Sequence, residues 1–210
     1  MYLRLKVCCF VSNSFQDCCY VLFLGYKCIS HQKRENTRAG GVAIFVKNDS
    51  VISSLHKIQK LNENRDPMLL ESEGYGDMCA AEIIIDGIKT IVFCVYISPK
   101  TSLKLVKMFL TRNLIYYSRD DAQVIVTGDF NIDISKEENM EVVNFMKHWM
   151  KFDLVTDPKQ PTTLGGSCID IIFARNISKL STKRYITYFS YHRPLFTLLS
   201  SQYEHTEDES

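Results

Sequence analysis

Short apolar runs broken by glycine and polar pairs characterise the first half of the chain. Residues 42–46 form a β-branched and aromatic run directly after Gly40 and Gly41, and this composition predicts a strand. The runs 82–85 and 89–97 flank Asp86-Gly87, a pair that favours the tight turn of a β-hairpin. The pattern therefore predicts a strand followed by an antiparallel hairpin.

The hydrophobic positions adopt a helical period after Pro99. This period predicts an amphipathic helix that packs on a sheet, with an apolar face at Leu103, Val106, Leu110, Leu114 and Tyr117. A short buried strand is predicted next, at residues 124–127. A second helix follows it, with a predicted apolar face at Val142, Phe145, Met146 and Trp149.

Strands return in the last third of the chain, at residues 169–174, 185–189 and 195–199. Strands that alternate with helices, without an interdomain linker, predict one α/β domain over residues 24–199. Residues 1–23 form an apolar, cysteine-rich segment of atypical character, and residues 200–210 are acidic with almost nothing apolar. A tail of that composition is predicted to be disordered.

Charge gives little guidance to a partner, because the formal net charge is only +1. A nucleic-acid partner must therefore be argued from local sites rather than from the field of the whole chain. Two local basic stretches exist, at Lys27, His31, Lys33, Arg34 and Arg38, and at Arg175, Lys179, Lys183 and Arg184. Solvated loop charge is the favoured interpretation of both stretches.

The cysteine pattern argues against a disulfide scaffold and against a zinc site. The chain has 8 cysteines, mostly inside apolar runs, without a C-x-x-C pair or a histidine at zinc spacing. Buried free thiols in a reducing compartment are the better interpretation, which favours an intracellular location, nuclear or cytoplasmic. Polar residues interrupt the apolar N-terminal stretch, so we expect no membrane span.

The sharpest candidate for chemistry is Thr127-Gly128-Asp129-Phe130-Asn131, at the carboxyl end of a predicted buried strand. Ligands of open α/β sheets bind at such ends. Asp129 could take a proton from water or contact a metal ion, and Asn131 could orient that water and donate to phosphate oxygens. The competing interpretation is an Asx-rich turn after a strand.

A second candidate is Asp170, an acid inside an otherwise apolar strand at residues 169–173. A buried aspartate needs a partner, and His192 is available. A histidine held by an aspartate can stabilise a phosphate transition state or transfer a proton. Taken alone, His192 is more often structural, and Tyr96 at the end of the run 89–97 is more often a core residue.

The order of these motifs resembles the endonuclease/exonuclease/phosphatase (DNase I-like) superfamily. Within this superfamily, the motifs most resemble the endonuclease domain of LINE-type, non-LTR retrotransposons. The resemblance covers residues 24–199. The landmarks are Gly-Gly-Val-Ala-Ile-Phe-Val (40–46), Val-Tyr-Ile-Ser-Pro (95–99), Gly-Asp-Phe-Asn (128–131), Pro-Thr-Thr followed by Cys-Ile-Asp-Ile-Ile-Phe (161–173) and Ser-Tyr-His-Arg-Pro (190–194).

The resemblance implies a four-layer α/β sandwich, in which two packed, mostly antiparallel sheets are flanked by helices. It implies hydrolysis of phosphodiester bonds in DNA with Mg²⁺ or Mn²⁺, and no small-molecule cofactor. Asp129 and Asn131 would activate the nucleophile, and Tyr96 would contact phosphate. His192 would stabilise the transition state, with Asp170 as its orienting partner.

The chain departs from the family at the metal-binding positions. Tyr191 stands where the family has an aspartate, and a phenol is a poor ligand for a hard cation. The family's first strands, which end in a metal-binding Asn and Glu, are missing or replaced, so we expect an N-terminally truncated domain. Asn13 and Asp17 are poor substitutes because neither ends a convincing strand.

These departures predict weakened metal binding and an impaired, degenerate nuclease. The alternative is a non-catalytic module on the same fold that binds nucleic acid or protein. Relatives in the superfamily also act on inositol phosphates, sphingomyelin or poly(A), but the loops that distinguish them are not visible in this sequence.

Overall fold

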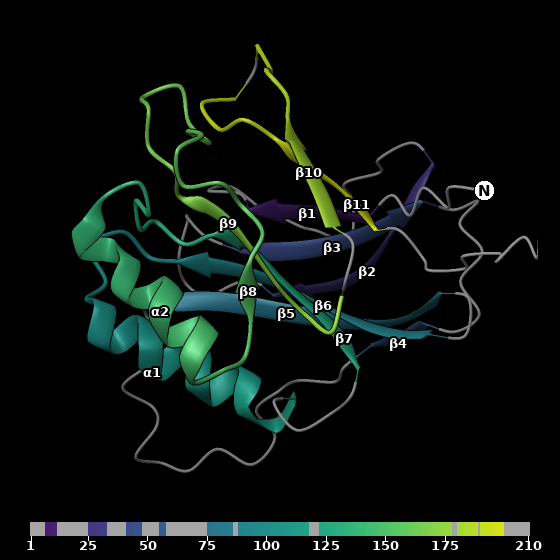
Figure 1. The fold of residues 1–210 in the computed structure, drawn as a ribbon. Helices are drawn as coiled ribbons and strands as arrows, with labels where there is room; N and C mark the ends of the chain where they lie inside the picture. The colour runs from purple at the N-terminus through teal and green to yellow at the C-terminus, as the bar shows by residue number, and fades with distance from the viewer. Residues whose placement is uncertain are drawn as a thin grey trace, which may run out of the picture.

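The computed structural model describes residues 7–11, 25–32, 41–47, 55–57, 75–85, 88–117, 122–177, 180–188 and 190–199 (Figure 1). Several sequence predictions lie outside these residues, namely those on Asn13, Asp17, Lys33, Arg34, Arg38, Gly40, Asp86, Gly87, Lys179 and the tail 200–210. Among the described residues, no helix is both long and apolar enough to cross a membrane.

A six-stranded sheet forms the centre of the molecule. Its strand order is β4 (Leu55–Lys57), β5 (Gly76–Ile85), β6 (Ile88–Ile97), β7 (Gln123–Asp129), β9 (Asp170–Arg175) and β8 (Asp153–Leu154). Strands β5 and β6 pair antiparallel along their whole length, which confirms the predicted hairpin. Strands β6 and β7 are parallel, because the chain crosses back through a helix between them.

Two helices cover one face of this sheet (Figure 1). They are α1 (Leu103–Leu114), which continues into the short helix η3 (Ile115–Tyr117), and α2 (Met140–His148), which follows the short helix η4 (Glu137–Asn139). The predicted apolar face of α1 is confirmed, since Val106, Leu110 and Leu114 are buried against the sheet.

One position on the predicted face of α2 is wrong. Trp149 is 78% exposed, because α2 ends at His148 and the chain turns away from the helix path there. Met150 and Phe152 are buried instead and take the place in the core that a longer helix would have given to Trp149.

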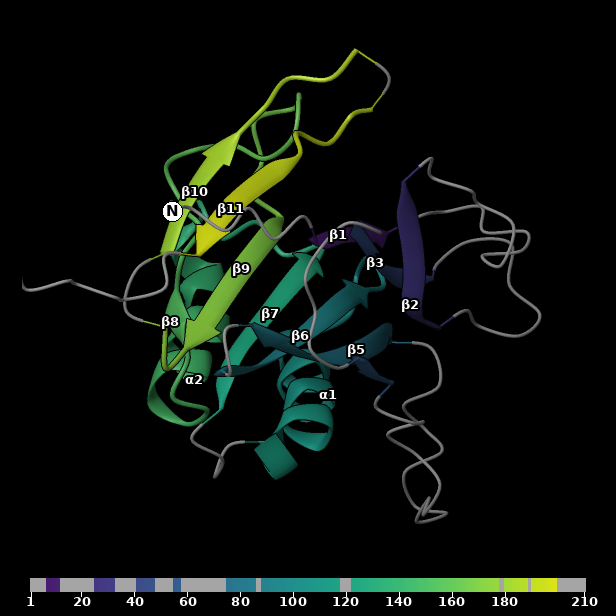
Figure 2. The same cartoon turned by 90° about the vertical axis from the view of Figure 1, so that its right-hand side faces the viewer.

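A three-stranded sheet packs on the opposite face of the central sheet (Figure 2). Its order is β1 (Val7–Val11), β3 (Val42–Lys47) and β2 (Tyr26–Gln32), and every pair is antiparallel. The apolar N-terminal segment therefore contributes a strand to this sheet. Between the sheets lies a buried cluster formed by Val42, Ile44, Val46, Cys79, Ala81, Ile83, Val92, Cys94 and Tyr96.

The last two strands, β10 (Leu180–Arg184) and β11 (Leu195–Leu199), form an antiparallel pair. The strand predicted at residues 185–189 is wrong, because the strand lies five positions earlier and residues 185–188 belong to the connection. Residues 185–188 carry a β-rich composition without the burial that a strand there would need.

The thiols and one of the basic residues also have defined environments. Cys79, Cys94 and Cys168 are buried, as predicted, and Cys28 is half-buried. Arg175 is buried rather than solvated, because its guanidinium donates to the Tyr117 carbonyl and lies over the Phe152 ring. This member of the second basic stretch is therefore a structural residue.

Candidate active site

Four polar side chains form a row across the central sheet. Asp77 on β5 pairs with Tyr96 on β6, Tyr96 pairs with Asp129 on β7, and Asp129 pairs with Asp170 on β9. Partners in register project from the same face of a sheet. Tyr96 belongs to the cluster between the sheets, so this cross-sheet row lies on the face turned toward the three-stranded sheet.

The turn after β7 fixes Asp129 and Asn131. Gly128 has φ of 146°, and a Cβ at this position would come 1.9 Å from the Val95 carbonyl oxygen, so only glycine lets β7 lie this close to β6. Asn131 has φ of 49° and its backbone N–H donates to Asp129 Oδ1 over 2.9 Å. The Asx turn is thus present, and it also positions the carboxylate.

Asn131 is tied to the neighbouring strand as well. Its Nδ2 donates to the carbonyl of Ile97 at the end of β6 over 2.8 Å. This bond fixes the orientation of the carboxamide, because the nitrogen has to face Ile97. The carboxamide oxygen is then available as an acceptor.

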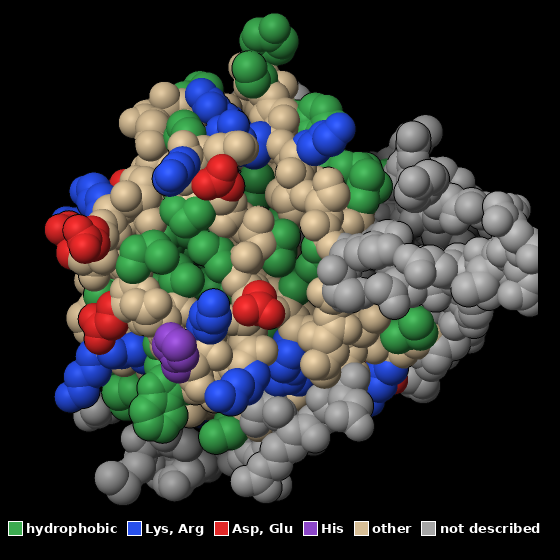
Figure 3. Space-filling view, viewed as in Figure 1, with side chains coloured by type: hydrophobic (Ala, Val, Ile, Leu, Met, Phe, Trp, Pro, Cys, Tyr) green, Lys and Arg blue, Asp and Glu red, His purple; other side chains and the backbone are tan. Residues whose placement is uncertain are grey.

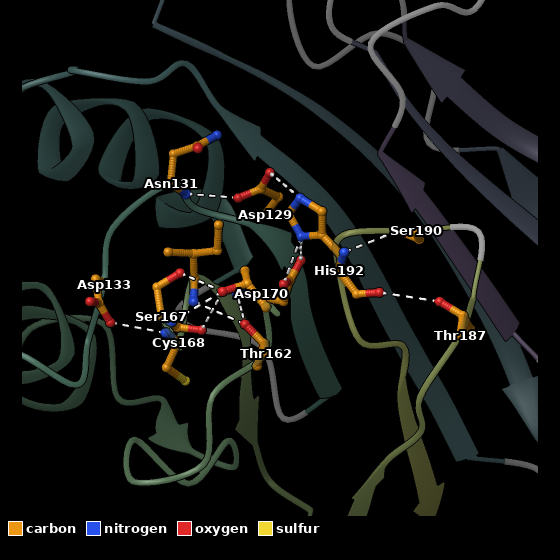
Figure 4. A network of polar contacts seen from close by, with 12 residues as sticks. Asp129, Asn131, Asp133, Thr162, Ser167, Cys168, Asp170, Thr187, Ser190 and His192 are labelled. Carbon is orange, nitrogen blue, oxygen red and sulfur yellow. Dashed lines mark hydrogen bonds and ion pairs between the residues drawn. The ribbon is translucent and has the colours of Figure 1, made fainter. Parts of the chain in front are cut away.

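His192 joins the two aspartates at the centre of the site (Figure 4). Its Nδ1–H donates to Asp170, with distances of 2.9 Å to Oδ2 and 3.1 Å to Oδ1. Its Nε2 lies 4.0 Å from Asp129 Oδ2. The predicted partnership of Asp170 and His192 is therefore confirmed. The imidazole lies between the carboxylates of Asp129 on β7 and Asp170 on the adjacent strand β9.

The surroundings of the site raise the pKa of both Asp129 and His192. Burial raises the pKa of Asp129 from 3.8 to about 6, with a smaller contribution from the charge of Asp170, while the Asn131 N–H and His192 oppose the rise. The hydrogen bond that His192 donates to the Asp170 carboxylate raises the pKa of His192, against the opposing effect of burial. An Asp129 carboxylate with a pKa of about 6 suits a general base near neutral pH, and a raised pKa favours the protonated form of His192.

Thr162 positions Asp170 and the segment that carries His192, and this role of Thr162 was not predicted. Its hydroxyl is fully buried and accepts from the backbone N–H groups of Ile169 and Asp170, each over 3.0 Å. Its carbonyl accepts from the N–H of Arg193 over 2.7 Å. Thr162 therefore links the start of β9 to the segment that carries His192.

Asp77 is the second residue that the sequence reasoning missed. It is fully buried in the cross-sheet row. The signal that identified Asp170, an acid next to an apolar run, was also present at Asp77. Its place in the row could not be predicted, because it depends on the register of β5 and β6.

Tyr191 and Tyr96 take different positions relative to the site. The Tyr191 hydroxyl lies 1.9 Å from where a Cβ on Gly165 would stand, so this side chain extends over the 162–166 loop. Its ring contacts His192 edge to face, with centroids 6.1 Å apart. Tyr96 is buried between the sheets, as a core residue would be, but its neighbour in register is Asp129.

The described residues do not form a recognisable metal centre. Within them, no three His, Cys, Asp or Glu side chains converge in a way that could hold an ion. The carboxylate of Asp170 is engaged by His192, and Tyr191 faces Gly165. Within the part of the chain that the structure describes, the acidic oxygens near Asp129 therefore do not make up the octahedral oxygen coordination that a magnesium ion prefers.

Comparison with known proteins identifies the fold. No protein family and no curated protein sequence matches the chain. Among solved structures, the endonuclease domain of TRAS1, a telomere-specific non-LTR retrotransposon, is 12% identical with a TM-score of 0.64, and the match covers 84% of this chain and 80% of that one.

Two further solved structures extend this likeness. The human Nocturnin catalytic domain is 13% identical with a TM-score of 0.58, over 91% of this chain and 79% of its own. An endonuclease/exonuclease/phosphatase from Bacteroides vulgatus is 14% identical with a TM-score of 0.53, over 85% and 77%. The chain therefore has the DNase I-like fold of the endonuclease/exonuclease/phosphatase proteins. At these identities the likeness establishes the fold, and the activity has to be argued from the site.

Proposed function

We propose that the chain is a phosphodiesterase domain that acts on DNA and whose metal-binding half is degenerate. One observation carries the proposal: His192 is held by Asp170 on one side and faces Asp129 across 4.0 Å on the other. The position of this group at the carboxyl end of β7 supports it further. DNA is proposed because the endonuclease domain of TRAS1, a telomere-specific non-LTR retrotransposon, has the same fold.

The geometry supports a division of labour for hydrolysis. Asp129, ionised above its pKa of about 6, accepts a proton from water while the water oxygen forms a bond to phosphorus. The Asn131 carboxamide oxygen accepts a hydrogen bond from the other O–H of that water, which stays covalently bound, and so orients the nucleophile. The bond from phosphorus to the leaving sugar oxygen breaks, and that oxygen takes its proton from solvent.

His192 and Tyr96 supply the remaining contacts in this scheme. The imidazolium of His192, fixed by Asp170, donates to the phosphoryl oxygens and stabilises their growing charge. Tyr96 is assigned a phosphate contact on the strength of its register with Asp129. No step is assigned to a metal ion.

Tyr191 is the residue that makes the metal-binding half of the site degenerate in this proposal. This residue stands at the position of the family's metal-binding aspartate and its hydroxyl lies over Gly165. Charge neutralisation by a divalent ion contributes several kcal/mol at a phosphoryl transition state, on the order of several powers of ten in rate. We therefore expect Mg²⁺ or Mn²⁺ to bind weakly and hydrolysis to be slow.

The test is nicking of supercoiled plasmid DNA in the presence of magnesium. We expect nicking by the purified chain to be so slow that it does not measurably exceed nicking by its Asp129→Ala variant. Asp153→Ala is the matched control, because it removes an exposed carboxylate from the edge strand β8. A clear magnesium-dependent difference between the chain and Asp129→Ala, absent for Asp153→Ala, would contradict the degenerate state and leave an active nuclease.

A binding role without hydrolysis is the second candidate. Lys183 is exposed on β10, and Arg184 next to it donates to the Pro161 carbonyl over 2.8 Å, so cations lie beside the segment that holds His192. A DNA affinity that falls as salt rises is expected of such a site. If the chain does not bind DNA even at low ionic strength, nucleic acid is excluded as its partner.

A further inference from the structure

The connection between β10 and β11 exposes an unusual set of side chains close to His192. Tyr188 is fully exposed, Ile186 is 71% exposed, and Tyr185 and Tyr191 are each more than half exposed. We call these four residues the aromatic loop. Figure 3 shows hydrophobic side chains at the far end of this connection, with Lys and Arg side chains below them.

Hydrogen bonds hold the aromatic loop against the segment that carries His192. The Tyr185 N–H donates to the Pro194 carbonyl over 3.0 Å, and the Thr187 hydroxyl donates to the carbonyl of His192 itself over 3.5 Å. The Tyr185 ring also packs edge to face on Phe196, with centroids 6.0 Å apart. The backbone on either side of Ile186 and the Tyr185 ring are therefore held in place, which lowers the entropic cost of ordering this loop around a ligand.

The chemistry of the aromatic loop fits a nucleobase. Aromatic rings bind bases by stacking, and nearby cations bind the phosphates that join them. Lys183 and Arg184 precede the loop directly on β10. A protein partner fits less well, because stable protein interfaces bury about 800 Å² on each side around a core depleted of charge, whereas this loop offers few side chains next to two cations.

We propose that the aromatic loop binds an unstacked nucleobase of the DNA strand whose phosphate lies at His192, with Tyr188 as the stacking ring. The proposal rests on the proposed function, because it places a nucleic-acid strand in the site. Tyr191 lies beside the imidazole, since its ring contacts His192 edge to face.

Fluorescence anisotropy with a labelled single-stranded oligonucleotide, in EDTA so that no strand is cut, tests this assignment. A second oligonucleotide of equal length carries abasic sites, which keep the phosphates and remove the bases. Tyr188→Ala should weaken binding of the base-containing strand by about 5- to 150-fold, the range of a lost aromatic stack, and should hardly change binding of the abasic strand. Tyr188→Trp should retain the affinity.

Trp149→Ala is the matched control, because it removes an exposed aromatic ring at the end of α2. Equal effects of Tyr188→Ala and Trp149→Ala, or equal losses on the two strands, would overturn the stacking role while leaving DNA as the partner. If Tyr188→Ala changes only the sedimentation of the chain, the loop is a protein interface and the proposal is overturned. If the unaltered chain binds neither strand at low salt, DNA itself is excluded and the proposed function fails as well.

Discussion

Asp129→Asn is the substitution for which the structure gives the clearest prediction. It removes a charge from a side chain that is only 9% exposed and keeps the size of that side chain. The new carboxamide oxygen can still accept from the Asn131 N–H, which lies 2.9 Å from Oδ1. The substitution therefore isolates the cost of burying a carboxylate, and we expect it to stabilise the fold at neutral and alkaline pH.

The magnitude follows from the pKa of Asp129. A rise from 3.8 to about 6 corresponds to about 3 kcal/mol, at about 1.4 kcal/mol per pKa unit. Well below about pH 4 the carboxyl is protonated in both states, and at about pH 4 little is yet gained. Between about pH 4 and pH 6 the unfolded chain ionises first, so the native protein loses stability that Asp129→Asn retains. Above about pH 6 the advantage of the variant is constant.

Chemical denaturation at about pH 4 and about pH 8 measures this difference. At the higher pH the variant should be more stable by about 3 kcal/mol, equivalent to about 6–12 °C in Tm for a chain of this size. Asp153→Asn, at an exposed position on β8, should change stability little at either pH. An Asp129→Asn protein that is no more stable at about pH 8 than the unaltered chain would refute the reasoning, because attraction to His192 would then outweigh burial.

Two further substitutions test how the site is held together. Thr162→Val leaves two backbone N–H groups, those of Ile169 and Asp170, without their acceptor, and should cost about 2–4 kcal/mol in denaturant unfolding; an unchanged midpoint would contradict the positioning role. His192→Gln tests the raised pKa of His192. The stabilisation from protonated His192 is complete below its unfolded pKa and is lost as pH rises through the higher folded pKa. The variant should therefore be least stable, relative to the unaltered chain, in acid. A loss of stability that grows with pH would contradict the pairing of His192 with Asp170.

The periodic elements could be predicted from the sequence because their signals are local. The Asp86-Gly87 pair marked the β5–β6 hairpin, and the helical period after Pro99 marked α1. Strand β2 had no such signal, since a bulge between Cys28 and Ser30 breaks the alternation of its side chains. Trp149 was misplaced because the period alone does not state where a helix ends.

The candidate site was predictable where one residue demanded a partner. Asp170 in an apolar strand required a hydrogen-bonding group, and His192 is that group. Thr162 and Asp77 were missed for the opposite reason. Their positions depend on which strands pair and in which register, and neither the spacing of residues nor their composition encodes that information directly.

In the proposed function, Asp129, Asp170 and His192 form a phosphodiesterase site that has lost a metal ligand at Tyr191. Magnesium-dependent nicking of supercoiled plasmid by Tyr191→Asp, compared with Tyr191→Asp combined with Asp129→Ala, tests it most directly. Tyr191→Phe serves as the control, because it removes the hydroxyl over Gly165 without adding a carboxylate. We predict that Tyr191→Asp, which restores one of the missing metal ligands, gains weak nicking activity that the added Asp129→Ala abolishes and that Tyr191→Phe lacks; nicking by Tyr191→Asp that persists without Asp129, or equal nicking by Tyr191→Phe, would contradict the proposal.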